Sequence, residues 1–277
     1  MKICIVLSTR PEIIKLAPLI EAFTKKKINF FLVNTNQHYS KNMSKVFFDF
    51  FKKKYPKYNI NANSSKEGDF FAKAVSGVER ILYKEKPNFL IIQGDTNTAL
   101  AGCFAASVYN RRQDKKINIV HVEAGLRSFD NNMPEEINRK LIDQMSNILF
   151  VPTKFDLENL KSEDITLDKK IFITGNTISD IVKNYLPLIK KNNILEIFQI
   201  FKKEYFLLTL HRPESVDDAS KFKKLILNIN KIGKKFNIQF LFPVHPRTEK
   251  IIKKIEVKQF KNIIFSKPLN FLDFLTI

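Results

Sequence analysis

Short apolar segments alternate with amphipathic segments along most of the chain, and this alternation constrains the fold more than any other feature. The apolar segments are rich in β-branched and aromatic residues, which is typical of strands buried on both faces. The first predicted strands are 2–7, 29–34, 89–93, 118–122, 148–151 and 170–174. The predicted helices are 11–26, 41–53, 68–84, 98–110, 135–146 and 154–160. This order predicts an α/β fold built on a doubly wound parallel sheet.

A second, shorter series of the same kind follows in the sequence. Strands are predicted at 205–210, 239–242 and 262–265, and helices at 218–236 and 247–255. We therefore predict two Rossmann-like domains, at 1–176 and 204–277, joined by a helical linker at 177–203. The second series stops at Ile277 inside an apolar stretch, so we expect this second domain to be incomplete.

Composition narrows the class of protein without identifying a partner. The 47 Lys and Arg residues exceed the 28 Asp and Glu residues and give a net charge of +19, which can attract nucleic acid or anionic lipid. The lysines are spread over many helices, however, and no basic motif with interleaved aromatic residues accompanies them. We therefore expect neither nucleic acid nor a membrane as a partner.

Cysteine usage and the absence of long apolar runs indicate the compartment. Cys4 and Cys103 lie inside apolar segments, which is typical of free thiols in a reducing cytoplasm. No apolar run reaches the roughly 18 residues that a membrane-spanning helix needs, and the stretch after Met1 is too short for a signal peptide. We therefore expect a cytoplasmic protein.

Several common ligand-binding motifs are missing from the sequence. There is no G-x-G-x-x-G and no G-K-[ST], so the usual phosphate cradles for NAD and ATP are not predicted. No Cys/His cluster has zinc spacing, and no G-x-S-x-G nucleophile elbow is present. We expect neither a metal ion nor another cofactor.

Rare and titratable residues gather where predicted strands give way to loops. Arg10, Asp95 and Glu123 each follow an apolar, strand-like run. All four histidines lie at comparable positions: His38, His121, His211 and His245. Because ligands of open α/β sheets bind at the carboxyl ends of the strands, we predict the functional site at this edge.

The first of these loops, STRPEIIKLAP, predicts an anion site. Pro11 suits the first position of a helix, whose N-terminal backbone donors then point toward the crevice. Arg10 lies beside them and Lys15 lies one turn further on, which suits a phosphate or diphosphate. An ordinary helix cap with solvated charges explains the same loop equally well.

Three carboxylates are candidates for proton transfer. Asp95 follows the strand at 89–93, although it also suits the N-cap of the next helix. Glu123 leaves a strongly apolar strand, where burial would raise its pKa and fit it for acid or base chemistry; the structural alternative is an ion pair with Arg127. Glu135 opens a helix, where an acidic residue also interacts favourably with the helix dipole.

Two loops of the second series carry a histidine followed by an arginine. LTLHRPES contains His211 and Arg212, and FPVHPRT contains His245 and Arg247. A single histidine at such a position is more often a packed or capping residue. Two such loops facing the loop of Arg10 are better explained by an anion site between the domains.

Together, these segments resemble the non-hydrolysing UDP-N-acetylglucosamine 2-epimerases. The resemblance follows the family's order over nearly the whole chain and implies a GT-B-like pair of domains, a cytoplasmic homodimer, and neither metal nor NAD. The reaction it implies is anti elimination of UDP followed by re-addition. The matching segments are STRPEIIKLAP, NQHYSKNM, QGDTNTALAG, HVEAGLRS, MPEEINRKLIDQ, FVPT, ITGNTISD, LTLHRPES and PVHPR.

The resemblance also implies roles for individual residues. Asp95, Glu123 and Glu135 match catalytic carboxylates, and His211 matches a catalytic-site residue at the substrate phosphates. Arg10 and Lys15 match contacts to the nucleotide sugar, and Phe274 matches a phenylalanine near the uracil. The positions that match a regulatory UDP-N-acetylglucosamine site are Gln37, Glu135, Arg212 and His245.

Several alternatives stay open at this level. The family's SGG-QEE segment, which grips the diphosphate and ribose, would follow Ile277, so we expect little activity from these residues alone. The segments NQHYSKNMSKVFF and LRSFDNNMPEEINR also resemble epimerases of other UDP-acetamido sugars, including diacetamido uronic acids. A GT-B glycosyltransferase and a fragment that only binds nucleotide sugar are the remaining hypotheses.

Overall fold

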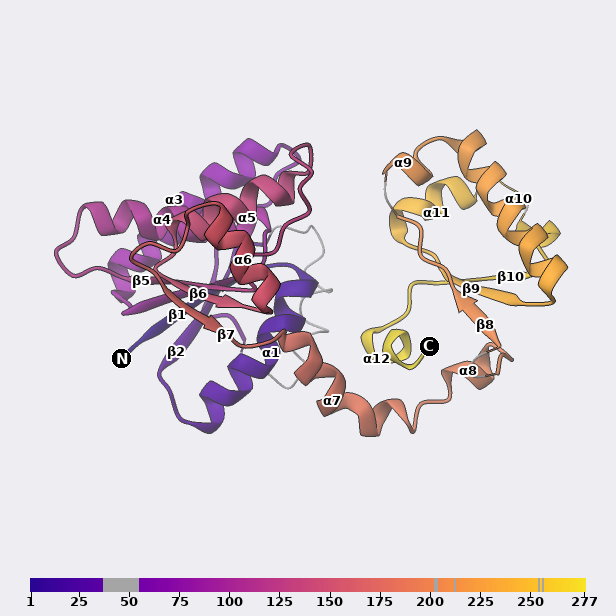
Figure 1. Ribbon diagram of the computed structural model, residues 1–277, viewed down its shortest axis with the longest axis horizontal. Coiled ribbons are helices and arrows are strands. Elements are labelled where there is room, and N and C mark those ends of the chain that lie inside the picture. Colours follow the sequence, from indigo (N-terminus) through magenta and orange to yellow (C-terminus); the bar gives the residue numbers. More distant parts are fainter. Residues whose placement is uncertain (37–54, 202–203, 212, 254, 256) are drawn as a thin grey trace. The chain divides into compact units, whose positions relative to one another are not determined.

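The computed structural model describes all residues except 37–54, 202–203, 212, 254 and 256 (Figure 1). The chain divides into two compact units, Met1–Ile181 and Val182–Ile277. Each unit is built on a parallel sheet, which confirms the predicted α/β class. The predicted helix at 41–53, together with Gln37 and His38, lies outside the described residues.

The first unit contains a seven-stranded parallel sheet in the order β3-β2-β1-β4-β5-β6-β7. The two-residue strand β3 was not predicted, because two residues are too few to show a periodic pattern. The strands are β1 (Ile3–Leu7), β2 (Phe30–Asn34), β3 (Tyr58–Asn59), β4 (Phe89–Gln93), β5 (Asn118–Val122), β6 (Ile148–Val151) and β7 (Lys170–Ile173).

Helices cover both faces of this sheet. Cys4 and Val6 point to the face that packs against α3, α4 and α5. Ile5 and Leu7 point to the opposite face and pack against Leu16 and other residues of α1. The period of two along β1 therefore divides its side chains between two cores. The helices are α1 (Arg10–Lys25), α3 (Glu67–Glu85), α4 (Asn97–Arg111), α5 (Pro134–Met145) and α6 (Lys154–Ser162).

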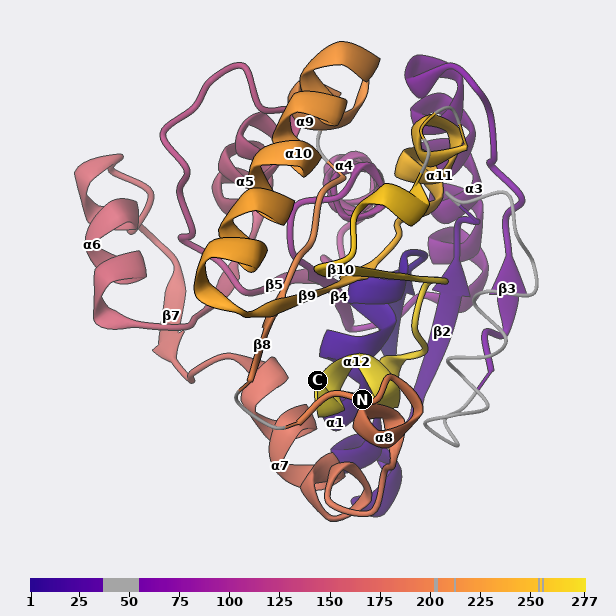
Figure 2. The same ribbon diagram turned by 90° about the vertical axis from the view of Figure 1, so that its right-hand side faces the viewer.

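The second unit contains a three-stranded parallel sheet in the order β10-β9-β8. Phe222 and Ile226 of α10 pack against Phe242 of β9, so α10 lies along this sheet (Figure 2). The elements after β7 are α7 (Thr177–Ile189), α8 (Ile194–Ile197), β8 (Tyr205–Leu207), α9 (Pro213–Val216), α10 (Ala219–Phe236), β9 (Gln239–Pro243), α11 (Pro246–Ile252), the 3-10 helix η1 (Val257–Gln259), β10 (Ile263–Ser266) and α12 (Phe271–Thr276).

One expectation about the second unit needs correction. The strand predicted at 205–210 ends at Leu207, because β8 is an edge strand whose register with β9 reaches only Leu207 opposite Leu241. The apolar stretch before Ile277 is helical. It forms α12, and the Asn270 side chain caps this helix by accepting a hydrogen bond from Asp273 N.

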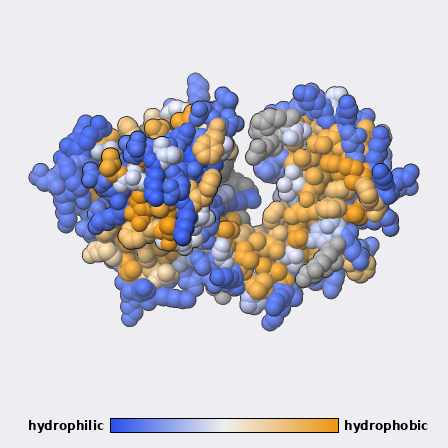
Figure 3. Space-filling model, in the orientation of Figure 1, coloured by the Kyte–Doolittle hydropathy of each residue, from blue (hydrophilic) through white to orange (hydrophobic). Residues whose placement is uncertain are grey.

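Hydrophilic residues are distributed over the visible surface of both units (Figure 3). No helix among the described residues is long and apolar enough to cross a membrane.

Candidate active site

The carboxyl ends of β1, β4 and β5 lie at the edge of the sheet where the sequence predicts the site. β1 lies between β2 and β4, so the strand order of the sheet reverses beside it. Such a reversal opens a crevice between the loops that leave the neighbouring strands. Arg10 begins α1 after β1, Asp95 follows β4, and Glu123 follows β5. The structure thus brings three predicted site residues to one edge of the first unit.

A buried carboxylate that was not singled out in the sequence joins two of these loops. Glu12 accepts hydrogen bonds from the backbone nitrogens of Ser8 (3.0 Å) and Thr9 (2.6 Å) and from the hydroxyl of Thr96 (2.7 Å). Burial raises the pKa of Glu12, and these hydrogen bonds oppose that rise. The spacing Thr9-x-x-Glu12 is the capping-box pattern and is the signal that could have found it.

Glu123 is held by three donors. Lys15 Nζ lies 2.8 Å from its Oε1 and 2.6 Å from its Oε2, and Asn176 Nδ2 donates to Oε1 at 2.9 Å. Gln93 also donates to Oε2. The Glu123 side chain is only 9% exposed, and its backbone has a positive φ of 73°. Such backbone geometry in a residue other than glycine is uncommon and costly, and it clusters at functional sites.

The predicted alternative partner for Glu123 was wrong. Arg127 does not pair with it. Instead, the Arg127 guanidinium lies 2.8 Å from Asp143 and 2.6 Å from Glu163, and its side chain is fully buried. The residues that follow β5 form a turn, and Gly125 within it has a φ of 80°.

Asp95 pairs with a cation and does not cap α4. Its carboxylate forms an ion pair with Arg139 of α5, and its side chain is 29% exposed. Its backbone carbonyl accepts a hydrogen bond from Asn138 Nδ2 at 2.9 Å. The N-cap of α4 is Thr96, whose hydroxyl accepts from Ala99 N at 3.1 Å. The capping interpretation of Asp95 was therefore wrong by one residue.

The two acidic residues that begin α5 differ in their surroundings. Glu135, the predicted catalytic residue, is exposed. Glu136 is buried and accepts hydrogen bonds from the backbone nitrogen and hydroxyl of Ser128, at 2.8 and 3.0 Å. It also pairs with Arg139 at 3.1 Å. The structure thus connects Glu136 to Asp95 through their shared arginine.

The remaining predicted residues lie in the second unit or outside the described residues. His211 and His245 follow β8 and β9, and their ring centroids are 5.5 Å apart. Phe274 lies on α12 and is exposed. Gln37 and Arg212 lie outside the described residues, so the regulatory site stays a prediction. In the described part of the chain, no cluster of three His, Cys, Asp or Glu residues could hold a metal ion.

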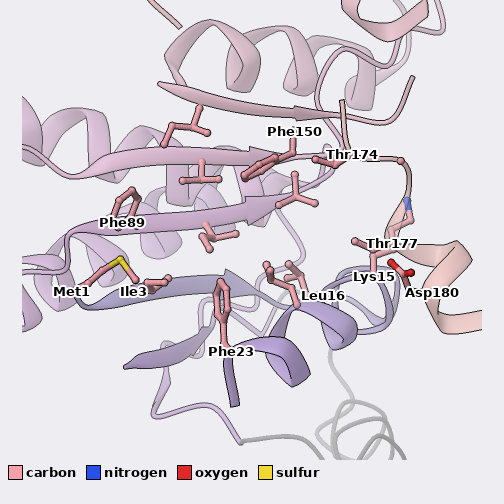
Figure 4. A pocket seen from close by; sticks show the side chains of 16 residues that line it. Met1, Ile3, Lys15, Leu16, Phe23, Phe89, Phe150, Thr174, Thr177 and Asp180 are labelled. Atoms are coloured by element: carbon pink, nitrogen blue, oxygen red, sulfur yellow. The ribbon is translucent and has the colours of Figure 1, made fainter. Parts of the chain in front are cut away.

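An apolar pocket of about 370 Å³ lies on the α1 face of the first sheet. Figure 4 shows that Phe23, Phe89 and Phe150 contribute to its apolar walls, whereas Lys15 and Asp180 lie together at one end. Walls of this kind do not suit a diphosphate, which needs cations and backbone donors. The polar strand ends next to the pocket therefore remain the better candidate for an anionic ligand.

Comparison with known proteins gives consistent matches over this whole arrangement. The family model described as UDP-N-acetylglucosamine 2-epimerase matches residues 21–277. The UDP-N-acetylglucosamine 2-epimerase of Methanococcus maripaludis is 47% identical, with 99% of this chain and 74% of the relative covered. The UDP-2,3-diacetamido-2,3-dideoxy-D-glucuronate 2-epimerase of Pseudomonas aeruginosa is 32% identical over 99% of this chain and 74% of its own length.

A solved structure matches as well. The crystal structure of Methanocaldococcus jannaschii UDP-GlcNAc 2-epimerase in complex with UDP-GlcNAc and UDP has a TM-score of 0.85 and 44% sequence identity to this chain. The match covers 99% of this chain and 75% of that chain.

Proposed function

The chain belongs to the UDP-N-acetylglucosamine 2-epimerase family, and we propose that it inverts carbon 2 of UDP-N-acetylglucosamine by anti elimination of UDP followed by re-addition. Identity of 47% to an enzyme of that name, over nearly the whole chain, supports the epimerase activity. The observation that carries the mechanism is the pair of carboxylates, Asp95 and Glu123, at the ends of neighbouring strands, each paired with a cation.

The reaction explains why carboxylates are needed. The proton on carbon 2 is not acidic, because no carbonyl carbon is directly attached to that carbon. Its removal becomes feasible when the bond from carbon 1 to UDP breaks at the same time and gives 2-acetamidoglucal. Fixed carboxylates then take the proton from one face and deliver a proton to the other. We assign this proton transfer to Asp95, Glu123 and Glu135.

Fixed geometry supports the assignment of Glu123 in particular. Its carboxylate is held by Lys15, Asn176 and Gln93 and has little freedom to rotate. Holding a reacting group in place lowers the entropic cost of the chemical step. Asp95 is oriented in a comparable way by Arg139.

The departing UDP needs donors that hold it until it returns. We assign this role to Arg10 and Lys15 beside the N-terminus of α1 and to His211 of the second unit, with Phe274 near the uracil. Cations and helix N-termini stabilise phosphate charge, and charge that develops in a transition state is stabilised most by groups already in position.

A related substrate is the second candidate. A relative that is 32% identical carries the name of a UDP-2,3-diacetamido-2,3-dideoxy-D-glucuronate 2-epimerase. The two substrates differ at carbons 3 and 6 of the sugar, whereas the chemistry at carbons 1 and 2 is the same. Parallel assays with both nucleotide sugars would identify the preferred one by its ratio kcat/KM.

We propose that the enzyme acts as a homodimer in the cytoplasm. Phe104 of α4 and Ile137 and Leu141 of α5 are large apolar side chains that are exposed on neighbouring helices, and apolar patches of this kind often mark protein interfaces. Cys4 and Cys103 are buried free thiols, as expected in a reducing compartment. Light scattering on the protein and on a Leu141→Glu variant would test the dimer.

Incubation with UDP-N-acetylglucosamine in deuterated water tests the proposed reaction. An epimerase forms UDP-N-acetylmannosamine with deuterium at carbon 2. A glycosyltransferase would transfer sugar without exchange at carbon 2, and a binding protein would saturate with UDP without turnover. Either of these two results would overturn the proposal.

A further inference from the structure

His121 is a buried histidine that the proposed mechanism does not use. The sequence places it at a strand end beside the other histidines, but it lies within β5 and is fully buried. It points to the same face of the sheet as Ile92, its partner on β4. This face is the one covered by α4 and α5. A polar side chain in such a place must satisfy both ring nitrogens.

Both ring nitrogens of His121 face hydrogen-bond acceptors. Nε2 lies 2.9 Å from the carbonyl oxygen of Gly94, and Nδ1 lies 2.7 Å from Oδ1 of Asp143. A backbone carbonyl can only accept, so Nε2 carries a proton and donates it. This hydrogen bond from Nε2 of His121 to Gly94 joins the core of the first unit to the turn that follows β4.

Asp143 holds the other side of the ring as a carboxylate. Burial by itself would raise the pKa of Asp143, but the charges of His121 and Arg127 and the hydrogen bonds that they donate outweigh burial and hold this pKa below its usual value. Its second oxygen accepts from Gly125 N at 3.2 Å and from Arg127 Nη1 at 2.8 Å. Nδ1 of His121 therefore faces an acceptor, as Nε2 does.

The turn held by His121 carries Asp95. Gly94 donates its own N–H to the carbonyl of Val122 at 3.1 Å and has a positive φ of 70°. With His121 bound to its carbonyl, both polar backbone groups of Gly94 are fixed to β5. Asp95 is the next residue, and a displacement of this turn would move its carboxylate.

We propose that His121 is a positioning residue: its Nε2–H fixes the Gly94 carbonyl and thereby sets the place of the Asp95 carboxylate in the active site. The proposal rests on the proposed function, in which Asp95 transfers a proton. Asp143 orients the imidazole in turn, so the chain of contacts runs from α5 through β5 to the turn after β4.

Two substitutions separate the contacts of the ring. In His121→Asn the amide nitrogen lies near the position of Nδ1, which keeps a donor to Asp143 and removes the donor to Gly94. In His121→Gln it lies near the position of Nε2, which keeps the donor to Gly94. We expect kcat of His121→Asn to fall about a hundredfold, the scale of a misplaced catalytic group, with KM changed less than about threefold. The kcat of His121→Gln should be at least about tenfold higher than the kcat of His121→Asn.

Amide hydrogen exchange measures the mobility of the turn after β4, and this measurement does not depend on enzyme activity. Amides of residues 94–97 should exchange faster in His121→Asn than in wild type or in His121→Gln. The proposal would be overturned by wild-type kcat and wild-type exchange in His121→Asn. Equal losses of kcat and of melting temperature in both variants would also overturn it, because they indicate a role in stability alone. If the wild-type protein makes no UDP-N-acetylmannosamine, the proposed function fails, and the exchange rates still decide the positioning role.

If neither variant folds, the nitrogen chemical shifts of the His121 ring in the wild-type protein test the proposal. A protonated Nε2 at pH 7 supports the contact with the Gly94 carbonyl, whereas an unprotonated Nε2 contradicts it.

Discussion

Nζ of Lys15 lies 2.6 Å from Oε2 of Glu123 and 2.8 Å from its Oε1, so a cation from the start of α1 holds a carboxylate at the end of β5. The resemblance assigns Lys15 to the nucleotide sugar. The observed pair adds a second role, because removing Lys15 also releases the carboxylate that is proposed to transfer a proton.

Lys15 and Arg10 should therefore differ in their effects. For Lys15→Met we expect at least about a tenfold loss of kcat, because the Glu123 carboxylate loses a charged partner of the kind that contributes about 1.5–3 kcal/mol. For Arg10→Ala we expect mainly weaker UDP binding, by about 1.5–3 kcal/mol, because one charge-assisted contact to phosphate is lost. Calorimetry with UDP and steady-state kinetics on both variants check the contrast. The same changes in kcat and UDP affinity in both variants would contradict this expected difference.

Removal of each proposed proton carrier should lower turnover. We expect Asp95→Asn, Glu123→Gln and Glu135→Gln each to reduce kcat at least about a hundredfold, the usual scale for a lost acid or base. Glu158→Gln is a useful comparison, because Glu158 of α6 lies in an exposed pair with Lys161 and should leave the rate unchanged. Near-normal rates in all three variants would remove the catalytic assignment.

An ion-pair cluster lies at the amino ends of strands of the first sheet, and it should make the free energy of unfolding depend on pH in the acid range. Glu85 accepts hydrogen bonds from Lys2, Lys57 and Tyr58, and these lower its pKa to about 2. Because the folded pKa lies below the unfolded one, its contribution is complete above the unfolded pKa of about 4.3 and is lost as the pH falls toward 2.

The variant Glu85→Gln tests this cluster. It should lower the free energy of unfolding at pH 7 by at least about 1.5 kcal/mol and flatten its dependence on pH between about 4 and 2. Glu158→Gln serves as a control, because Glu158 is 63% exposed in its pair with Lys161, and exposed pairs contribute about 1 kcal/mol or less. Urea denaturation at several pH values measures both. Equal losses in the two variants would count against the cluster.

The turn after Glu123 should accept only glycine at position 125. A Cβ on Gly125 would lie 2.4 Å from the backbone oxygen of Asp156, and φ is 80°. Gly175 has a similar φ of 78° but open space around it. We expect Gly175→Ala to cost about 1 kcal/mol, from the backbone alone, and Gly125→Ala to cost at least about 2 kcal/mol more. Thermal denaturation of both variants checks the difference, and equal costs would show that the turn can shift.

The elements of the fold were predictable because their signals are local. The strands predicted at 89–93, 118–122 and 148–151 have the same bounds as β4, β5 and β6. Burial on both faces leaves such segments uniformly apolar, and this composition can be read over a few residues. Strand β3 gave no such signal, because two residues are too short for a pattern.

The positions of Asp95 and Glu123 near strand ends were also determined by the sequence alone, because each follows an apolar run within a few residues. Their partners were decided only by the tertiary structure. Lys15 lies 108 residues from Glu123 in the chain, and Arg139 lies 44 residues from Asp95. Arg127, only four residues from Glu123, turns instead to Asp143 and Glu163. Sequence spacing favours the near partner, whereas the order of the parallel strands and the turn at Gly125 determine which charges meet.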